Sequence, residues 1–481
     1  MTQARLIRCT FVTLAALAAA SPVFAQEQTP APEETEDVPE EQQEAAQEAL
    51  KGQPPGTKVI VVPPPEPTVR EYDPSEETDQ EAEAESRVPG EQLHPKGEDE
   101  MMADHPVDRG DISFRPGKGV EINSADDKFQ LRIRVRVQFL WTILSGEVGP
   151  GDADEPDEVT NNFRIRRARF VFQGHAFGKH NQYKLEIDPL RADNVVLDYY
   201  LDFTKKRDVQ VRIGQYKISS NRQRVISSGN LQMVDRSRVN AEFSLDRDIG
   251  IDIRSRDFLG KDKMRYVLGI TSGTGLNNPQ FKDFAMVYLV RFEYLPFGIF
   301  RDYSEVDFAR TKPRLSIGTT YSFFQNADRA RGMVGAPFAD GGTADYHFLF
   351  VDAIFKARGF SAISEFAYRT GKRQFGDITG DEEGNPIEPT AARNGLGWML
   401  QAGYLVPRTR FEFAARGSMI FGSSKRAPTS LNDSYGGTFS LSYYFARHPF
   451  KIQADVSQIW NEQERFGQGE TVFRLQLQAS L

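Results

Sequence analysis

The sequence predicts an all-β protein, a 16-stranded antiparallel transmembrane β-barrel that follows a disordered acidic N-terminal segment. Residues 129–139 show the underlying pattern, because apolar side chains occupy every odd position while Arg132, Arg134 and Arg136 lie at even positions. Successive side chains of a strand point to opposite faces, so this strand has one apolar face and one cationic face. A membrane barrel accommodates both, with lipid outside and a water-filled lumen inside. Fifteen further strand-like segments and an abrupt change of composition near residue 110 support the same architecture.

The first 25 residues have the layout of a secretory signal peptide. Arg5 and Arg8 precede the apolar run of residues 11–20, and Ala25 supplies the small residue expected at the cleavage site. The run is shorter than the ~20 residues that a transmembrane helix requires. Cleavage would remove Cys9, the only cysteine, so the mature chain is expected to lack disulfides and cysteine-bound metal.

Residues 26–110 are expected to form a disordered periplasmic tether rich in proline and glutamate. They hold 24 acidic and 6 basic residues, whereas residues 111–481 hold 44 acidic and 51 basic ones. A segment this polar buries too little apolar surface to offset the entropy of folding. The net charge of −9 therefore combines an acidic tether with a basic barrel domain, residues 111–481. The tether fits either a solvated spacer or a partner-binding or oligomerising segment.

Sixteen strands are expected from apolar alternation bounded by Gly, Pro, Asn and Asp. They cover residues 129–139, 163–173, 183–188, 195–203, 209–216, 249–254, 264–270, 284–294, 315–323, 347–357, 360–368, 396–406, 411–416, 438–445, 450–456 and 471–481. An even count closes an antiparallel barrel with both chain ends on the periplasmic side, and barrels of this size leave an aqueous channel. The last strand ends at Leu481, although such barrels commonly end on an aromatic residue. A soluble β-sandwich would show the same alternation, but not together with a signal peptide and so little non-β sequence.

Arginines on the predicted inner faces indicate the kind of solute that the lumen accepts. A passage lined with fixed positive charge stabilises anions and excludes cations. Acidic residues share the same faces, so many of these charges are expected to form salt bridges along the wall, with the first-strand arginines the best candidates for free charge. The expected anion path consists of Arg132, Arg134, Arg136, Arg167, Arg169 and Arg212.

The segment from Lys217 to Arg238 does not alternate and is expected to be a loop. A basic loop folded into the lumen would narrow the passage and set its selectivity, whereas an extracellular loop would face lipopolysaccharide phosphates; the inward loop is favoured. Its candidate constriction residues are Lys217, Arg222, Arg224, Arg236 and Arg238, with Asp235 as the single acid.

Several separate sequence pieces resemble the phosphate-selective porin O and P family. They are Phe163-Arg164-Ile165-Arg166-Arg167-Ala168-Arg169, Asp198-Tyr199-Tyr200-Leu201, Gly214-Gln215-Tyr216-Lys217, Asp235-Arg236-Ser237 with Asn240, and Arg247-Asp248-Ile249-Gly250, followed by Asp352, Gly359-Phe360, Glu365, Tyr368, His448 and Lys451-Ile452-Gln453. The resemblance implies a homotrimeric 16-stranded outer-membrane porin with a constricting third loop and an arginine-lined anion path. Family members usually continue with Pro-Phe after the lysine of the Gly-Gln-aromatic-Lys piece, but this chain reads Ile218-Ser219-Ser220. Phosphate specificity is therefore not carried over.

Enzymatic and nucleic-acid-binding functions find little support. The six histidines form no HExxH motif, and the acidic run Asp377, Asp381, Glu382 and Glu383 lacks the spacing of a calcium loop. Basic residues alternate with lipid-facing apolar ones, which leaves no surface for nucleic acid. We therefore expect no catalytic residue, cofactor or metal.

The sequence thus predicts a passive channel of the bacterial outer membrane that prefers anions, with phosphate or related oxyanions as the leading solutes. Its expected partners are small anionic solutes, outer-membrane lipid and lipopolysaccharide, and further copies of the chain. The alternatives are a weakly selective general porin and a structural or adhesive barrel.

Overall fold

The computed structural model describes residues 110–481 apart from 116, 147–158, 192–193, 279–283, 381–385, 388–389, 424–430, 463, 465 and 467–468. The expected signal peptide and nearly all of the expected tether lie outside these described residues. The described part belongs to one compact unit, residues 73–481. Its helices are all too short or too polar to cross a membrane.

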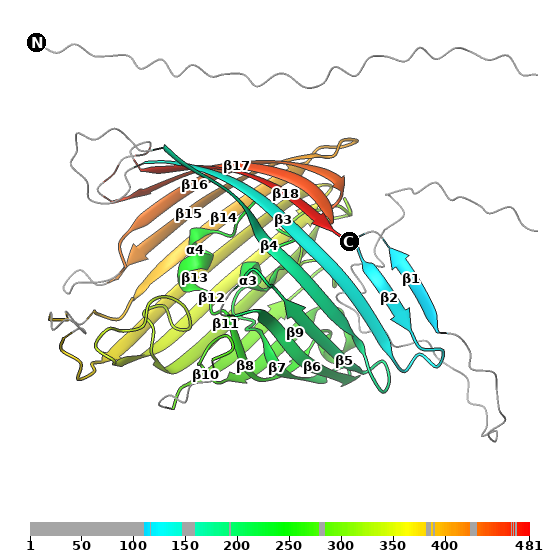
Figure 1. Ribbon diagram of the computed structural model, residues 1–481, viewed down its shortest axis with the longest axis horizontal. Helices are drawn as coiled ribbons and strands as arrows, with labels where there is room; N and C mark the ends of the chain where they lie inside the picture. Colours follow the sequence, from blue (N-terminus) through cyan, green and yellow to red (C-terminus); the bar gives the residue numbers. More distant parts are fainter. Residues whose placement is uncertain are drawn as a thin grey trace, which may run out of the picture. The chain divides into compact units, whose positions relative to one another are not determined.

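Sixteen strands pair with their sequence neighbours in antiparallel fashion, and the last pairs with the first, so that they form a closed barrel (Figure 1). They are β3 (Gln130–Ser145), β4 (Val159–His175), β5 (Asn181–Ile187), β6 (Val196–Lys206), β7 (Val209–Lys217), β8 (Arg247–Ser255), β9 (Met264–Thr271), β10 (Met286–Tyr294), β11 (Arg314–Ala327), β12 (Thr343–Ala357), β13 (Phe360–Gln374), β14 (Gly395–Leu405), β15 (Phe411–Gly422), β16 (Ser434–Ala446), β17 (Phe450–Asn461) and β18 (Glu470–Ser480). Each matches one of the sixteen segments that alternation predicts. The predicted fold class is confirmed.

Alternation along the strands separates an apolar outer face from a polar inner face. On β10, Tyr288, Val290 and Phe292 are exposed, whereas the intervening Arg291 and Glu293 are buried inside the ring. Because strand side chains alternate, one register places every aromatic of this strand outward and every charge inward. The strand pattern therefore fixes which residues can reach the lumen.

The barrel closes at a seam between β3 and β18, and a hairpin extends this seam. The backbone amides of Val135 and Leu481 each donate to the other residue's carbonyl, at 3.1 and 2.8 Å, so the chain pairs up to its last residue. Beyond this point, β2 (Gly119–Asn123) replaces β18 as the partner of β3, and β1 (Asp111–Arg115) pairs with β2. The sequence did not predict this hairpin, because its two strands of five residues are too short to show a period.

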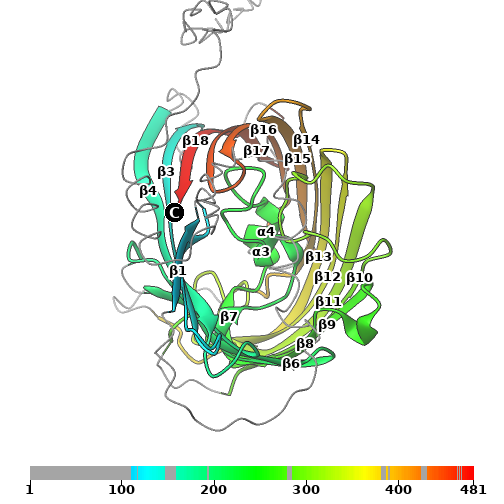
Figure 2. The same cartoon turned by 90° about the vertical axis from the view of Figure 1, so that its right-hand side faces the viewer.

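A loop of residues 218–246 lies inside the ring of strands and carries α3 (Arg222–Val225) and α4 (Arg238–Phe243) (Figure 2). Its apolar side chains, including Ile226 and Phe243, join a buried cluster with Phe324, Phe348 and Met399 of the wall. Burial of this cluster attaches the loop to the β10–β15 side of the barrel. The sequence predicts the loop but neither helix, since each is under two turns long.

Candidate functional site

A cavity of about 440 Å³ lies between β4 and the inward loop. Its wall is strongly cationic: nine of its thirteen lining residues are basic and one is acidic. These lining residues are Arg164, Ile165, Arg166, Arg167, Arg169, Asp188, Leu190, Arg191, Lys217, Arg224, Ser228, Arg236 and Arg247. The cavity therefore brings together basic residues from strands and loops that lie far apart in the sequence.

A β-bulge on β4 supplies four of these arginines. Gln138 of β3 pairs with Arg167, but the next residue, Phe139, pairs with Ile165, so Arg166 is an extra residue in the ladder. The bulge reverses the inside and outside parity of the strand, which allows Arg164, Arg166, Arg167 and Arg169 all to line one cavity. Simple alternation predicts only Arg167 and Arg169 here, and a bulge leaves no local sequence signal that would identify the other two.

Carboxylates compensate part of this positive charge. Arg169 donates to Glu186 at 2.5 Å, and Arg247 donates to Asp198 at 2.5 Å. Arg166 pairs with Asp235, and Arg224 pairs with Asp246. These pairs hold the guanidiniums in position without removing the excess of basic groups at the cavity wall.

Of the other five basic groups of the cavity, Arg167 lies 4.0 Å from the carboxylate of Asp235, and four have no carboxylate partner among the described residues. The side chains of Arg164, Arg191 and Lys217 form no hydrogen bond or ion pair within that part of the chain. Arg236 donates only to the backbone carbonyls of Gln223 and Ile226, at 2.7 and 2.6 Å. These four groups are the net positive charge that the cavity presents to a solute.

The pKa values of the loop residues reflect the same positive field. Burial and the nearby Arg224 lower the pKa of Arg236 to about 9. Burial alone would raise the pKa of Asp235, but Arg166 and Arg167 outweigh it and lower that pKa to about 2. A site that disfavours a further cation and favours a carboxylate is one that attracts anions.

The three arginines of β3 have different surroundings. Arg132 is not free, because its Nε and Nη2 donate to Glu121 of the hairpin at 2.9 and 2.6 Å. Among the described residues, Arg134 has one polar partner, the side-chain amide oxygen of Gln173, to which it donates at 3.4 Å. Arg136 donates to hydroxyls of the loop, namely those of Ser227 and Ser228 at 2.9 and 3.1 Å. The expectation of free charge on this strand is therefore wrong for Arg132, since the unpredicted hairpin supplies a carboxylate.

Arg212 lies in the wall and away from the cavity. Its Nε and Nη2 donate to the two carboxylate oxygens of Asp202 at 2.7 and 2.5 Å, and its guanidinium stacks over the Tyr200 ring at 3.8 Å. A bidentate pair of this kind leaves no net charge for a solute. Arg212 is thus one of the wall salt bridges that the sequence predicts in general, rather than a residue of the path.

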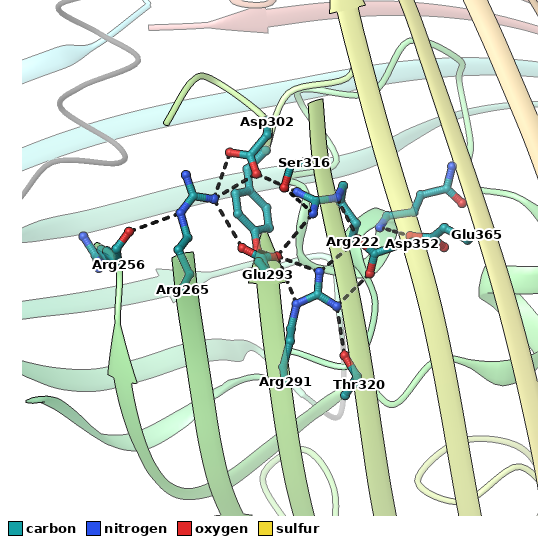
Figure 3. Close-up of polar contacts among 12 residues, drawn as sticks. Arg222, Arg256, Arg265, Arg291, Glu293, Asp302, Ser316, Thr320, Asp352 and Glu365 are labelled. Atoms are coloured by element: carbon teal, nitrogen blue, oxygen red, sulfur yellow. Dashed lines mark hydrogen bonds and ion pairs between the residues drawn. The ribbon is translucent and has the colours of Figure 1, made fainter. Parts of the chain in front are cut away.

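Arg222 is fully buried and anchors the loop to the opposite wall (Figure 3). It donates from Nε to Asp352 at 2.8 Å, from Nη1 to Asp302 at 2.7 Å and from Nη2 to Ser316 at 2.8 Å. Although burial opposes the charged form, the surrounding carboxylates raise the pKa of Arg222 above its ordinary value. Arg222 therefore does not line the passage, and its role as a constriction residue is corrected to that of an anchor.

Further contacts support this anchor. Arg291 bridges Asp352 and Glu293 at 2.7 and 2.6 Å (Figure 3). The carboxylate of Glu365 accepts from the backbone N–H of Gln223 at 2.5 Å. Arg238, another predicted constriction residue, begins α4 and does not line the cavity. The loop thus presents Arg224 and Arg236 to the cavity, beside Lys217 at the end of β7, and uses Arg222 for attachment.

Comparison with known proteins yields one sequence family. Residues 147–312 match the family described as phosphate-selective porin O and P, and this range contains β4, the inward loop and all the lining residues of the cavity. No curated protein matches the chain.

Solved structures with a similar fold include an anion-selective porin from Comamonas acidovorans (10% identity, 73% of this chain and 99% of that one, TM-score 0.48). A loop-deleted OmpT of Vibrio cholerae is similar as well, with 10% identity, 73% of this chain and 99% of that one covered, and a TM-score of 0.46. The outer membrane channel DcaP of Acinetobacter baumannii is similar with 11% identity, 73% of this chain and 97% of that one covered, and a TM-score of 0.44. The matched family and the closed barrel indicate a channel rather than an enzyme. The chain is an outer-membrane β-barrel channel that is similar, over residues 147–312, to the phosphate-selective porin O and P family.

Proposed function

We propose that this barrel is a passive diffusion channel that prefers anions, with phosphate or related oxyanions as its leading solutes. The observation that supports this function is the cavity, whose lining includes nine basic residues and one acidic residue. Fixed positive charge beside a low-dielectric wall lowers the energy of an anion and raises that of a cation. The cavity therefore favours one sign of solute along the lumen.

The chemistry of the lining residues favours oxyanions within the anion class. Eight of the nine basic residues are arginines, whose planar guanidiniums can donate to two oxygens of one phosphate or carboxylate group. Arg164 and Arg191 lack a carboxylate partner within the described chain and so retain this donor capacity. The description of the matched family supports the same solute class.

The attachment of the loop supports a fixed passage. Arg222 and its partners Asp352 and Asp302 are all at most 2% exposed, so water does not compete for their hydrogen bonds. A loop held by buried charge pairs keeps Arg224 and Arg236 at the cavity without reorganisation when a solute passes. Persistent geometry is what a selective but passive channel requires.

Around this channel we also propose the remaining features that the sequence predicts. Residues 1–25 would direct export and be removed, residues 26–110 would form a periplasmic tether, and residues 111–481 would form the barrel domain. The exposed apolar outer face would contact lipid and, in the outer leaflet, lipopolysaccharide.

An incompletely paired strand supports the proposed homotrimer. β4 pairs with β5 only through residues 170–175, so in the described chain the second edge of residues 159–169 has no strand partner. Phe163 of this edge is 72% exposed and pairs with Trp141, which pairs with Leu475 of β18, so the edge is level with the apolar belt. Unpaired backbone is not stable in hydrocarbon. We propose that a second copy of the chain covers it.

Reversal potentials in planar bilayers under a KCl gradient test the anion preference. The wild type should be anion-selective, and R164Q/R191Q should lower its Cl⁻/K⁺ permeability ratio because these guanidiniums face the cavity unpaired. A matched control is K205Q/K312Q, which removes two exposed lysines that do not line the cavity. Cation selectivity of the wild type would refute the proposal, and equal effects of the two double variants would refute the assignment to the cavity.

A weakly selective general porin is the second candidate within transport. The departure after Lys217, where the chain continues with Ile218 rather than Pro-Phe, falls in the loop that borders the cavity and favours this candidate. Competition of phosphate with chloride current separates the two, since only a specific site saturates at low phosphate concentration. A structural or adhesive barrel would show no conductance.

A further inference from the structure

A second segment enters the barrel from the rim opposite to that of the inward loop. The chain joins β10 to β11 at the rim where β3 begins, whereas the inward loop joins β7 to β8 at the other rim. Lys356 of β12 holds this connection by donating to the backbone carbonyls of Arg301 and Val306, at 2.6 and 3.0 Å. Between these two carbonyls, Asp302, Ser304 and Glu305 are buried. Residues 301–307, the rim segment, therefore form a second inward element.

Glu305 joins the rim segment to the inward loop. Its backbone N–H donates to the Asn230 carbonyl at 3.1 Å, and its carboxylate accepts from the backbone N–H of Gln232 at 2.7 Å. The same carboxylate accepts from the side chains of Gln223 in the loop and Gln401 of β14, at 3.3 and 2.9 Å. One residue thus connects the rim segment, the inward loop and the wall.

Together the two elements cover the wall from β10 to β18, the covered half. Lys451 of β17 donates to the Leu231 carbonyl at 2.7 Å, and Gln478 of β18 donates to the Gly229 carbonyl at 3.2 Å. The buried charged residues of these described strands are five basic and five acidic ones, namely Arg291, Lys356, Arg369, Arg416 and Lys451 with Glu293, Asp352, Glu365, Glu412 and Asp455. The covered half is therefore buried and balanced in charge.

The wall from β3 to β9, the open half, remains accessible. The side chains of Arg132 and Lys184 are 30% and 20% exposed, and Arg134 and Gln173 are half-buried. The basic cavity borders the same half, through β4 and the start of β8. A solute beside the open half meets an excess of positive charge, whereas a solute that crossed the covered half would meet balanced charge.

We propose that the rim segment and the inward loop, joined by Glu305, seal the covered half, so that solutes pass only beside the open half. This inference rests on the proposed channel function and adds the route that solutes take. Glu305 is a positioning residue, because it acts on solutes only by keeping the two elements together. Its removal leaves the buried N–H of Gln232 without its carboxylate acceptor, which weakens the joint. A route through the balanced half then opens and lowers the selectivity.

Thiol accessibility tests the route. In a C9S background, which removes the only native cysteine, Q173C places a thiol in the open half and S442C places one in the covered half, where Ser442 is 1% exposed. The probe is a neutral, water-soluble methanethiosulfonate, so that rates report access rather than charge, and mass spectrometry follows the labelling. We expect Q173C to react at least about tenfold faster than S442C, which reacts only through local opening. Comparable rates would overturn the inference.

Substitution of Glu305 tests the joint. E305A should raise the labelling rate of S442C toward that of Q173C and lower the Cl⁻/K⁺ permeability ratio, whereas E305Q, which keeps an oxygen acceptor, should restore part of the protection. E462A, at an exposed position after β17, is the matched control and should change neither quantity. Unchanged protection of S442C in E305A, or equal effects of E305A and E462A, would overturn the role of Glu305.

The two measurements separate the inference from the proposed function. A protected S442C in a barrel that proves cation-selective would refute the anion preference and support the route. A reactive S442C in an anion-selective barrel would refute the route alone. If E305A does not fold, the rates of Q173C and S442C in the C9S background still decide whether the covered half is sealed.

Discussion

Arg222 of α3 donates from Nε to Asp352 of β12 at 2.8 Å, across a sequence separation of 130 residues, and both side chains are at most 1% exposed. This pair attaches the inward loop to the barrel wall. Glu293 and Asp302 also accept from Arg222, so one guanidinium serves three carboxylates. The position of the loop that borders the passage therefore depends on Arg222, a residue that does not line the passage.

Replacing Arg222 with Met should loosen the loop. The substitution leaves Asp352 and Asp302 buried with fewer cationic partners, which costs about 3–5 kcal/mol for a buried pair. We expect noisier single-channel currents with frequent partial closures and a lower unfolding temperature of the purified barrel. K312Q, at an exposed position, is the control. Quiet currents like those of the wild type would show that the apolar contacts of the loop suffice.

Replacing Arg212 with Gln should affect stability more than selectivity. Its guanidinium is paired with Asp202 and stacked on Tyr200, so its loss leaves a buried carboxylate with a weakened set of partners. The barrel should unfold at a lower denaturant concentration, while the reversal potential should change less than in R164Q/R191Q. A shift in reversal potential larger than that of the cavity variant would place Arg212 on the path after all.

Asp235 should make the barrel more stable above pH 4 than below it. Its pKa is lowered to about 2 in the folded chain, so the folded state favours the ionised form. The stabilisation is complete above the ordinary carboxylate pKa and is lost as the pH falls from about 4 to about 2, by on the order of 2 kcal/mol. Denaturant unfolding of wild type and D235N at pH 6 and pH 2.5 checks this, because the advantage of the wild type should shrink at the lower pH. A constant difference would contradict it.

Arg236 should make anion selectivity sensitive to alkaline pH. Its pKa is lowered to about 9, so its positive charge is present at neutral pH and is lost as the pH rises through 9. The Cl⁻/K⁺ permeability ratio should fall between pH 8 and pH 10, and by less in R236Q, which carries no charge there at any pH. An identical fall in both proteins would assign the effect to other groups.

Phe163 should contribute to contact between copies of the chain. It is 72% exposed on the β4 edge that has no second strand partner in the described part of the chain. F163S should weaken the oligomer, seen as a larger monomer fraction when the detergent-solubilised protein is analysed by light scattering. F284S is a control, since Phe284 is 65% exposed before β10 and away from that edge. Equal loss of oligomer in both variants would argue against an interface at β4.

The barrel itself follows from local sequence. Alternation along segments such as residues 129–139 determines strand identity, the apolar outer face and the polar inner face, because the two-residue period is a property of each strand alone. The loop is recognisable for the same reason, since alternation stops over the predicted residues 217–238, although Lys217 belongs to β7 and the loop extends to residue 246. The predicted wall salt bridges also occur, as Arg212 and Asp202 show.

The composition of the cavity depends instead on how distant segments meet. Arg166 is a bulged residue only because Gln138 and Phe139 of the neighbouring strand pair with the residues on either side of it. This pairing register brings Arg164 to the inner side. Arg132 loses its free charge to Glu121 through a hairpin too short to predict.

The sequence by itself determined a closed sixteen-stranded barrel with a basic interior, since repeated local alternation and charge composition need no knowledge of neighbours. Only the tertiary structure decided which arginines remain uncompensated and which, like Arg222, are buried as anchors. The physical reason is that charge compensation is a pairwise property of groups within a few ångströms, and here those pairs join residues as far apart as 239 positions in the chain, as Arg474 and Asp235 show.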